Sequence, residues 1–465
     1  MIHALPMMRQ LQLALALLCL ATGALGQDTL QVDEGIDESS GEELSVYDTL
    51  VFDSPREIIS GRENESLRKE VSTNLSIRDG SDQVEATDIL RFQDTISDIE
   101  STGGAWDINL TENLSSMGEI YQQRGMHQEA VDSYGRAMHI SRVNLGLTSQ
   151  EHLPFVERMV DSYLALGDWD SADRYHDYLF NALRQEYGLN DPRMVPALRK
   201  RASWELSLFN ARWGEELGAK LLNALFLYRT ASNLVNRYYG PDDQRFSNYL
   251  RDTAGAAYLV SRYQALIKEA ATGQYRRVQE SFVDGSRGLV GNYDDGYRQG
   301  LEALQLIVAS FPEERRTTVD YAEALLLEAD WYLVFDRRRA AEAKYSEAYD
   351  LIASLPVEEG SNRSLFSSVL PLPAFSEEIE SILTTSNYEG RVAIARDSGY
   401  VDVQFAVTRF GEVTDLEVLT DENQVDSRVV SSLRRRIRGT MFRPVIVDGE
   451  LVRSENNRFR YYYAY

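Results

Sequence analysis

The sequence is poor in cysteine, in proline and in long hydrophobic runs. Its one cysteine is Cys19, so a chain that has lost its first residues has no thiol for a disulfide or for a cysteine-ligated metal. The eleven prolines form no run, which excludes a proline-rich spacer. After the N-terminal segment, no stretch is apolar for the roughly 18 residues that a membrane span requires.

Positive charge is also scarce. Forty-eight lysines and arginines stand against 73 acidic residues, a net charge of −25. This balance argues against nucleic acid and against anionic lipid surfaces as partners. A length of 465 residues predicts two or three domains.

Catalytic and metal-binding patterns are absent from the sequence. The five histidines show no spacing of three or four and no HExxH motif, which argues against a zinc hydrolase. The glycine-rich stretch 285–300 lacks the Gly-Lys-Ser/Thr of a phosphate-binding loop, and no GxSxG is present. We therefore predict no catalytic, cofactor-binding or metal-ligating residue, no cofactor and no enzymatic activity.

The first 26 residues have the pattern of a secretory signal. Arg9 precedes an apolar run from Leu11 to about Leu25, which ends in small residues before Gln27. Leu18, before Cys19, is too large for a lipoprotein signal. An exported chain without disulfides fits a bacterial periplasm. The alternative is an uncleaved inner-membrane anchor that faces the periplasm; if the signal is cleaved, no transmembrane span remains.

Residues 27–105 are acidic and have few aromatic side chains. Such a segment buries too little apolar area to offset the entropy of ordering, so we predict that it is largely disordered. Short helices within 86–99 are compatible with the spacing of Ile89, Phe92 and Ile96.

Residues 106–357 carry small and aromatic residues at the spacing of a helical hairpin. The pattern resembles a tetratricopeptide repeat (TPR), in which small residues let two antiparallel helices approach and aromatic residues fill the gap. The first copy consists of Gly118, Tyr121, Gly125, Ala130, Tyr134 and Ala137.

Two further copies are recognisable. Tyr163, Gly167 and Ala172 recur 42 residues on, against about 34 in the common repeat. A third copy contains Ala329, Tyr332, Ala341, Tyr345 and Ala348. Residues 195–310 match poorly. We predict an all-α TPR-like array with degenerate middle units; the alternative is an irregular helical domain with chance matches.

Residues 358–385 are rich in proline and serine and are predicted to be a linker. In the final segment, 386–465, the period of hydrophobic residues changes from 3.6 to 2. Strands are predicted at 400–407 and 413–419, a helix at about 427–437 and a last strand at 457–463. The expected fold is therefore α+β and multidomain, with a small β-β-α-β C-terminal domain.

This C-terminal order resembles that of the TonB energy-transducer family, over about residues 390–465. The resemblance rests on a glycine after the first strand, a Phe-Arg-Pro after the helix and an Asp-Gly turn: Gly411, Phe442, Arg443, Pro444, Asp448 and Gly449. Pro444 suits an edge strand or a bulge, and Asp-Gly suits a two-residue turn with positive φ. These residues are expected to serve mainly the fold.

The resemblance implies a binding site on the last strand. In the family, the free edge of this strand pairs with a peptide of an outer-membrane receptor, and main-chain hydrogen bonds provide affinity. The corresponding residues are Arg458, Phe459, Arg460, Tyr461, Tyr462 and Tyr463.

The favoured function is that of a periplasmic adaptor of the cell envelope with protein partners and a link to transport across the outer membrane. The alternative is a membrane-anchored energy transducer of the TonB family. Against it, the sequence lacks the family's long proline-rich spacer and its Tyr-Pro pair before the first strand.

Overall fold

The computed structural model describes most of the chain from Asp82 onward, together with two short strands before it. The described residues are 51–52, 56–57, 82–147, 149–271, 295–355, 364–384, 398–421 and 425–464. The predicted signal at 1–26 and most of the predicted disordered segment lie outside them. Among the helices within these ranges, none has the length and hydrophobicity needed to cross a membrane.

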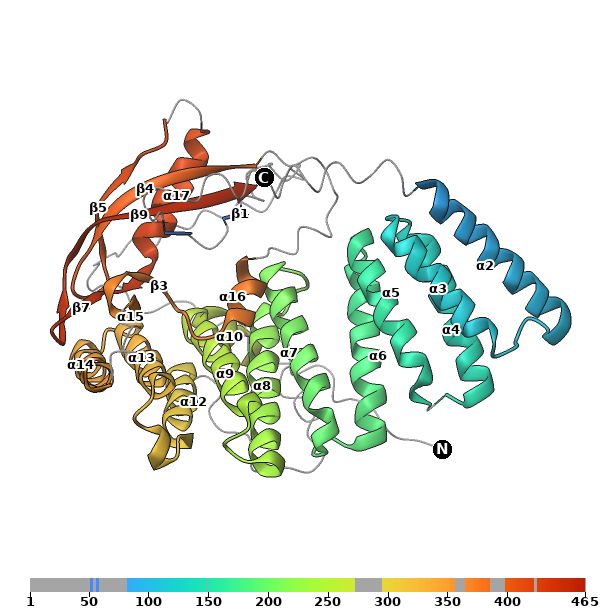
Figure 1. Ribbon diagram of the computed structural model, residues 1–465, viewed down its shortest axis with the longest axis horizontal. Helices are drawn as coiled ribbons and strands as arrows, with labels where there is room; N and C mark the ends of the chain where they lie inside the picture. The colour runs from blue at the N-terminus through green and yellow to red at the C-terminus, as the bar shows by residue number, and fades with distance from the viewer. Residues whose placement is uncertain are drawn as a thin grey trace, which may run out of the picture. The chain divides into compact units, whose positions relative to one another are not determined.

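The helical region consists of antiparallel helices, each packed against a neighbour in the chain (Figure 1). Its five main pairs are α3/α4, α5/α6, α7/α8, α9/α12 and α13/α14. Their bounds are Leu110–Gln123, His127–Leu145, Leu153–Leu166, Trp169–Tyr187, Val195–Asn210, Leu217–Tyr239, Gln244–Arg262, Gly296–Ser310, Val319–Val334 and Arg338–Ser354. The short helix α10 is Gln264–Ala271.

The first pair has the close approach that the repeat pattern predicts. A Cβ on Gly118 would lie 2.8 Å from Cζ of Tyr134, so only glycine lets the ring lie against this helix. Ala130 and Ala137 are completely buried, and Tyr121 packs against the cluster that contains Ala130. Gly125, with φ of +72°, provides the turn between the helices. The region is therefore TPR-like in its packing.

The middle units, which match the repeat poorly in sequence, form helix pairs of the same kind. Three helices end at a glycine with positive φ, and the residue three positions later caps the next turn with its side-chain oxygen. These pairs are Gly146 with Ser149, Gly188 with Asp191, and Gly240 with Asp243. This recurrent loop, rather than the small and aromatic residues, marks the boundaries between units.

The C-terminal sheet has the strand order β1-β9-β4-β5, and β2 also pairs with β9. The long strands are β4, Ser398–Val407, and β9, Ser454–Ala464, and β5 is Val413–Val418. Helix α17, Ser427–Gly439, covers the sheet with Val429, Leu433 and Ile437, all buried. The predicted β-β-α-β order is found, with three additional short strands between α17 and β9, two of which form a hairpin.

Those two strands form the turn predicted for Asp448-Gly449. Strand β7, Val445–Val447, pairs with β8, Glu450–Val452, so that Val447 faces Glu450 across a two-residue loop. Both loop residues have positive φ, +50° and +81°, as a type I′ turn requires.

The predicted linker contains ordered elements. Helix α15 is Ser364–Ser367, strand β3 is Leu370–Leu372 and helix α16 is Glu377–Thr384. Strand β3 pairs with β6, Met441–Arg443, in a separate two-stranded sheet. Helix α16 packs on α7 and α9. Residues 364–384 of the predicted linker are thus ordered, because their apolar side chains are buried against both regions.

Before residue 106, the structure describes one helix and two short strands, and the helix includes residues 86–99, where the sequence is compatible with short helices. Helix α2, Asp82–Gly103, buries Ile96 against Leu110, Ala137 and Ile140 of the first pair. Strands β1, Val51–Phe52, and β2, Arg56–Glu57, pair with β9. The helical region therefore begins earlier than the predicted residue 106.

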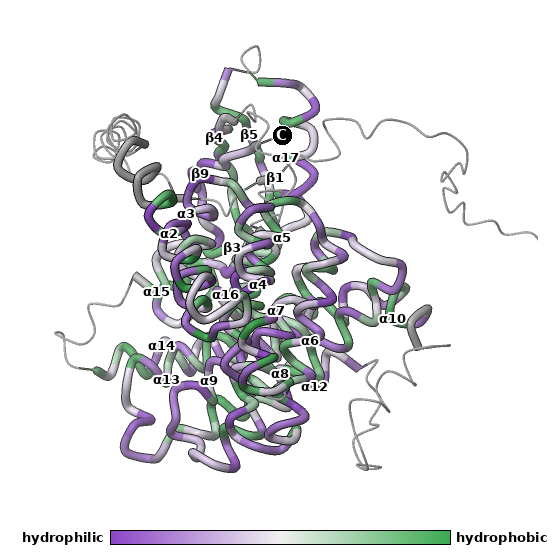
Figure 2. The backbone as a smooth tube through the Cα atoms, turned by 90° about the vertical axis from the view of Figure 1, so that its right-hand side faces the viewer, coloured by the Kyte–Doolittle hydropathy of each residue, from purple (hydrophilic) through white to green (hydrophobic). Residues whose placement is uncertain are grey.

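Hydrophobic residues recur at intervals along the helices, as Figure 2 shows by colour. The main core lies between α7, α8, α9 and α12, a second one lies under the C-terminal sheet, and a third joins the two regions. This third core combines Leu325 and Leu333 of α13 with Leu372 and Ile446 from the C-terminal elements. The last helix pair and the C-terminal domain are therefore held together by shared apolar burial.

Candidate protein-binding site

Strand β9 is flanked on both sides, in contrast to the free edge that we expected. On one side it pairs with β4 from Ser398↔Ala464 to Val407↔Ser454. On the other, Tyr463 pairs with Phe52 and Arg460 pairs with Arg56. A segment that precedes the array thus occupies the edge of β9 by antiparallel strand pairing.

Of the six residues predicted to bind a partner, two are buried, one is held in an ion pair and three are at least partly exposed. Phe459 and Tyr461 are buried under the sheet, where Phe459 stacks on Phe405. Arg460 donates two hydrogen bonds, of 2.7 and 2.8 Å, to the carboxylate of Asp402. Arg458, Tyr462 and Tyr463 are exposed or partly exposed. Side-chain contact with a partner is therefore limited to these three exposed or partly exposed residues and stays a prediction.

The Phe-Arg-Pro motif lies where the C-terminal domain meets the array. Phe442 is completely buried against Phe405, and its backbone N–H donates to the carbonyl of Gly411 over 2.9 Å. Gly411 has φ of +80°, and a Cβ on it would lie 2.2 Å from the carbonyl oxygen of Phe442. Pro444 separates β6 from β7, where it interrupts pairing. These contacts agree with a structural role.

Arg443, in contrast, reaches out of its domain to the last helix pair. Its Nε and Nη2 atoms donate to the two carboxylate oxygens of Asp330 over 2.9 and 2.5 Å. Tyr345 also donates to Asp330, over 2.7 Å. The side chain of Asp330 is completely buried and that of Arg443 is 9% exposed. Burial alone would lower the pKa of the Arg443 guanidinium, but the Asp330 carboxylate raises it above the ordinary value, so the guanidinium stays charged.

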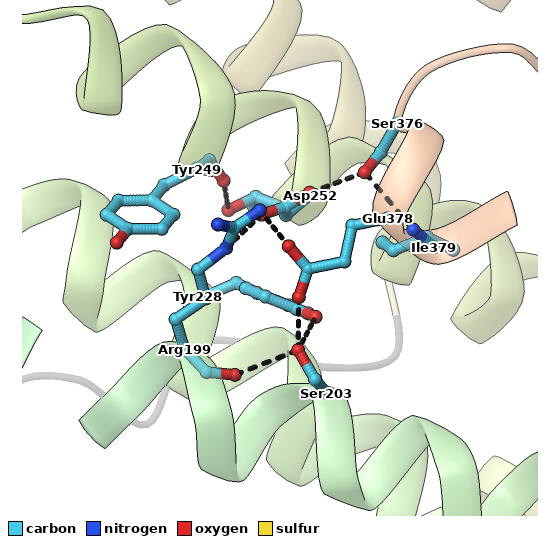
Figure 3. A network of polar contacts seen from close by, with 9 residues as sticks. Arg199, Ser203, Tyr228, Tyr249, Asp252, Ser376, Glu378 and Ile379 are labelled. Carbon is cyan, nitrogen blue, oxygen red and sulfur yellow. Dashed lines mark hydrogen bonds and ion pairs between the residues drawn. The ribbon is translucent and has the colours of Figure 1, made fainter. Parts of the chain in front are cut away.

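A second polar network fixes α16 on the array, and Figure 3 shows it from close by. Glu378 forms an ion pair with Arg199 and accepts a hydrogen bond from Ser203. Arg199 also contacts the carboxylate of Asp252, with Nε 3.3 Å from Oδ2. Arginine thus bridges a carboxylate of the array and one of α16.

Ser376 completes this network and begins the helix. Its hydroxyl donates to Asp252 and accepts from the backbone N–H of Ile379 over 3.3 Å, which is an N-terminal cap. Burial raises the pKa of the Asp252 carboxyl, while the Ser376 hydrogen bond and the Arg199 charge oppose the rise. One serine therefore satisfies both a helix terminus and a buried acid.

Apolar side chains of the same segment enter the main core of the array. Phe375 and Ile379 are 2% and 4% exposed. Phe375 lies 5.1 Å from the ring of Trp331, and Ile379 packs on Gly255. We call the surface that receives this segment, formed by Arg199, Ser203, Asn210, Asp252 and Gly255, the α16-docking surface.

The sequence analysis did not identify this surface. The helix that fills this surface is indicated by the stretch "FSEEIESI", in which a hydroxyl precedes two acids and two isoleucines lie three residues apart. That pattern is typical of a capped amphipathic helix. The neighbouring prolines led to its assignment as a linker.

The described residues also contain no group of three or more His, Cys, Asp or Glu side chains that could hold a metal ion. Of the histidines in the described part, His176 stacks on Trp204 with ring centres 4.2 Å apart. Burial lowers its pKa to about 3, so it is a neutral core residue at physiological pH.

Comparisons with known proteins give structural neighbours only. No family model matches the chain, and no curated protein matches it in sequence. A putative kinesin light chain from Podosopora anserina with nearly identical TPR-like repeats has a TM-score of 0.34 and 14% identity, over 53% of this chain and 97% of that one. BtubC (BKLC) from P. vanneervenii has a TM-score of 0.33 and 13% identity, over 58% of this chain and 91% of that one.

Proposed function

We propose that this chain is a periplasmic adaptor protein of the cell envelope, which joins protein partners through a TPR-like array and a TonB-like C-terminal domain. The array supports the binding role because stacked helical hairpins form extended surfaces for protein partners. The buried pair of Arg443 and Asp330 supports a joint role, since it ties the C-terminal domain to the last repeat.

The observation that carries the proposal is the pairing of β9 with β1 and β2. It supports strand addition at the side of β9 where the family resemblance implies that a receptor peptide binds. Backbone pairing of this kind depends little on the sequence of the added strand. The partner of this edge is accordingly an extended peptide segment of an envelope protein.

The core that the C-terminal domain shares with the array argues against a freely extending arm. An energy transducer must reach across the periplasm, whereas this C-terminal domain shares a core with the array. We therefore favour an adaptor over a transducer. If the protein is recovered in the soluble periplasmic fraction with Gln27 as its first residue, the transducer alternative is wrong.

Site-specific photo-crosslinking tests the proposal. A photoreactive residue in place of Arg458, which is exposed on β9, should capture an envelope protein in cells. The matched control is Glu417, which is exposed on β5 in line with Arg458, because Gln404 pairs with both. We expect capture at position 458 and none at 417.

Deletion of residues 46–60 removes both strands that occupy the edge and should increase capture at position 458. Equal capture at the two positions, or no capture from the deleted chain, would contradict partner binding at β9.

A further inference from the structure

Helix α16 and the two residues before it lie outside the array in sequence, and the array binds them. We infer that the α16-docking surface is a peptide-binding site, which the chain's own segment 375–382 fills in this structure. Its external ligand is a short acidic helix of a partner protein with the same side-chain pattern. The inference rests on the proposed adaptor function, since it names the class of partner that the array accepts.

The docking surface is shaped to receive a helix together with one of its aliphatic side chains. A Cβ on Gly255 would lie 2.6 Å from Cδ1 of Ile379, so glycine at this position allows the helix to approach. The Asn210 side chain donates to the backbone carbonyl of Ile382 over 2.8 Å. This carbonyl lies in the last turn of α16, where carbonyl groups have no N–H donor within the helix. The Gly255 contact selects an aliphatic side chain, whereas the Asn210 hydrogen bond recognises the end of a helix.

The polar groups of the surface define the chemistry of the ligand. Arg199 and Ser203 together bind one carboxylate, which Glu378 provides. The side chain of Asp252, 3% exposed, accepts from a hydroxyl, which Ser376 provides. The apolar positions are an aromatic residue directly before the hydroxyl and a branched aliphatic residue three positions after it. The pattern is therefore aromatic, hydroxyl, any residue, carboxylate, aliphatic.

The charged part of this contact lies near solvent, where a ligand can reach it. The side chains of Arg199 and Glu378 are 38% and 26% exposed. Helix α16 itself is eight residues long, well below the roughly 12–15 residues at which isolated helices become stable in water. Its helical order therefore depends on the docking surface, and a competing helix that takes the surface also releases α16.

A tethered segment has a local concentration of the order of millimolar, so an untethered ligand competes poorly until the segment is displaced. The test therefore compares three full-length chains: the wild type, in which segment 375–382 fills the surface, a variant whose segment can no longer dock, called the emptied chain, and a variant whose segment is fixed there by a disulfide. The probe is a fluorescent synthetic peptide of residues 370–386. Fluorescence anisotropy measures its binding, and a peptide carrying Ile379→Asp is the negative control.

The emptied chain carries Ile379→Asp, which places a charge against Gly255. Its matched control is Glu377→Gln, a charge change at an exposed position of the same helix. We expect the emptied chain to bind the peptide at least tenfold more tightly than the wild type and the Glu377→Gln variant. A folded emptied chain, with helix content unchanged by circular dichroism, that does not bind the peptide would overturn the inference.

A disulfide lock provides a second test that does not depend on the emptied chain folding. An ideal Cβ on Gly255 lies 3.4 Å from Cβ of Ile379, close to the separation in a disulfide. In a Cys19→Ser chain, the pair Gly255→Cys and Ile379→Cys should form this bond. The probe for this pair carries Ile379→Ala, which leaves room for the side chain introduced by Gly255→Cys. The oxidised form should bind none of this peptide and the reduced form should bind it. Equal binding by both forms would place the peptide elsewhere and overturn the inference, whereas crosslinking at position 458 would be unaffected.

Discussion

The buried pair of Arg443 and Asp330 gives the sharpest prediction for stability. Replacing Arg443 with alanine leaves the Asp330 carboxylate completely buried, with Tyr345 as its remaining donor among the residues that contact it here. The loss includes both hydrogen bonds of the bidentate contact, 2.9 and 2.5 Å long. Breaking a buried pair by removing one partner costs about 3–5 kcal/mol.

The expected effect is measurable by urea denaturation. With a slope of about 3 kcal/mol per molar urea, a loss of 3–5 kcal/mol lowers the midpoint by about 1–1.7 M. Fluorescence is a suitable probe because Trp331, next to Asp330 in the chain, is completely buried.

A triple variant separates the cost of an unpaired charge from the value of the pair. Arg443→Met, Asp330→Leu and Tyr345→Phe replace the whole polar group by apolar side chains, which is often neutral or stabilising in buried pairs. We expect its midpoint to lie near that of the wild type. If Arg443→Ala shifts the midpoint by less than about 0.3 M, corresponding to about 1 kcal/mol at the same slope, the pair does not hold the two regions together.

Four further substitutions have defined outcomes. Gly118→Ala forces a methyl group against Tyr134 and should lower the free energy of unfolding by about 1–3 kcal/mol. Gly135→Ala, with its nearest neighbour 3.9 Å away, should raise the free energy of unfolding by about 0.5–1 kcal/mol. A loss of stability in both variants would refute the packing argument. Gly449→Ala has room for its methyl group but needs φ of +81°, so thermal unfolding should reveal a loss of about 1–2 kcal/mol. Burial raises the pKa of Glu380 to about 7 from 4.5, so its contribution to stability is present below pH 4.5 and is lost as the pH rises through 7. Glu380→Gln should therefore reduce the difference in urea midpoint between pH 5 and pH 8; an unchanged difference would assign it to other groups.

The local parts of the fold could be predicted from the sequence. Gly118 and Tyr134 lie within one helical hairpin, so their spacing alone specifies the contact. The Asp448-Gly449 turn is equally local, because both residues take the positive φ that their side chains tolerate.

The long-range contacts could not be predicted in this way. Asp330 lies within the apolar helix α13, and its sequence neighbours do not indicate that its partner is Arg443, 113 positions away. Segment 375–382 was mistaken for a linker because its helix is stabilised by residues of α7 and α9 and not by its own length. The pairing of β1 and β2 with β9 was missed for the same reason, since strand pairing at such distance leaves no periodicity in the sequence.

The position of β9 also constrains the order in which the protein folds. Val51 pairs with Ala464, so this pairing cannot form until residues up to 464 are available, and for an exported protein that is after translocation. The helical hairpins, whose contacts are local, can form well before that point, whereas distant strand pairing is slow. Until β9 is available, β1, β2 and β4 lack their common neighbour, and the partly folded chain exposes unpaired strand edges to which a chaperone could bind.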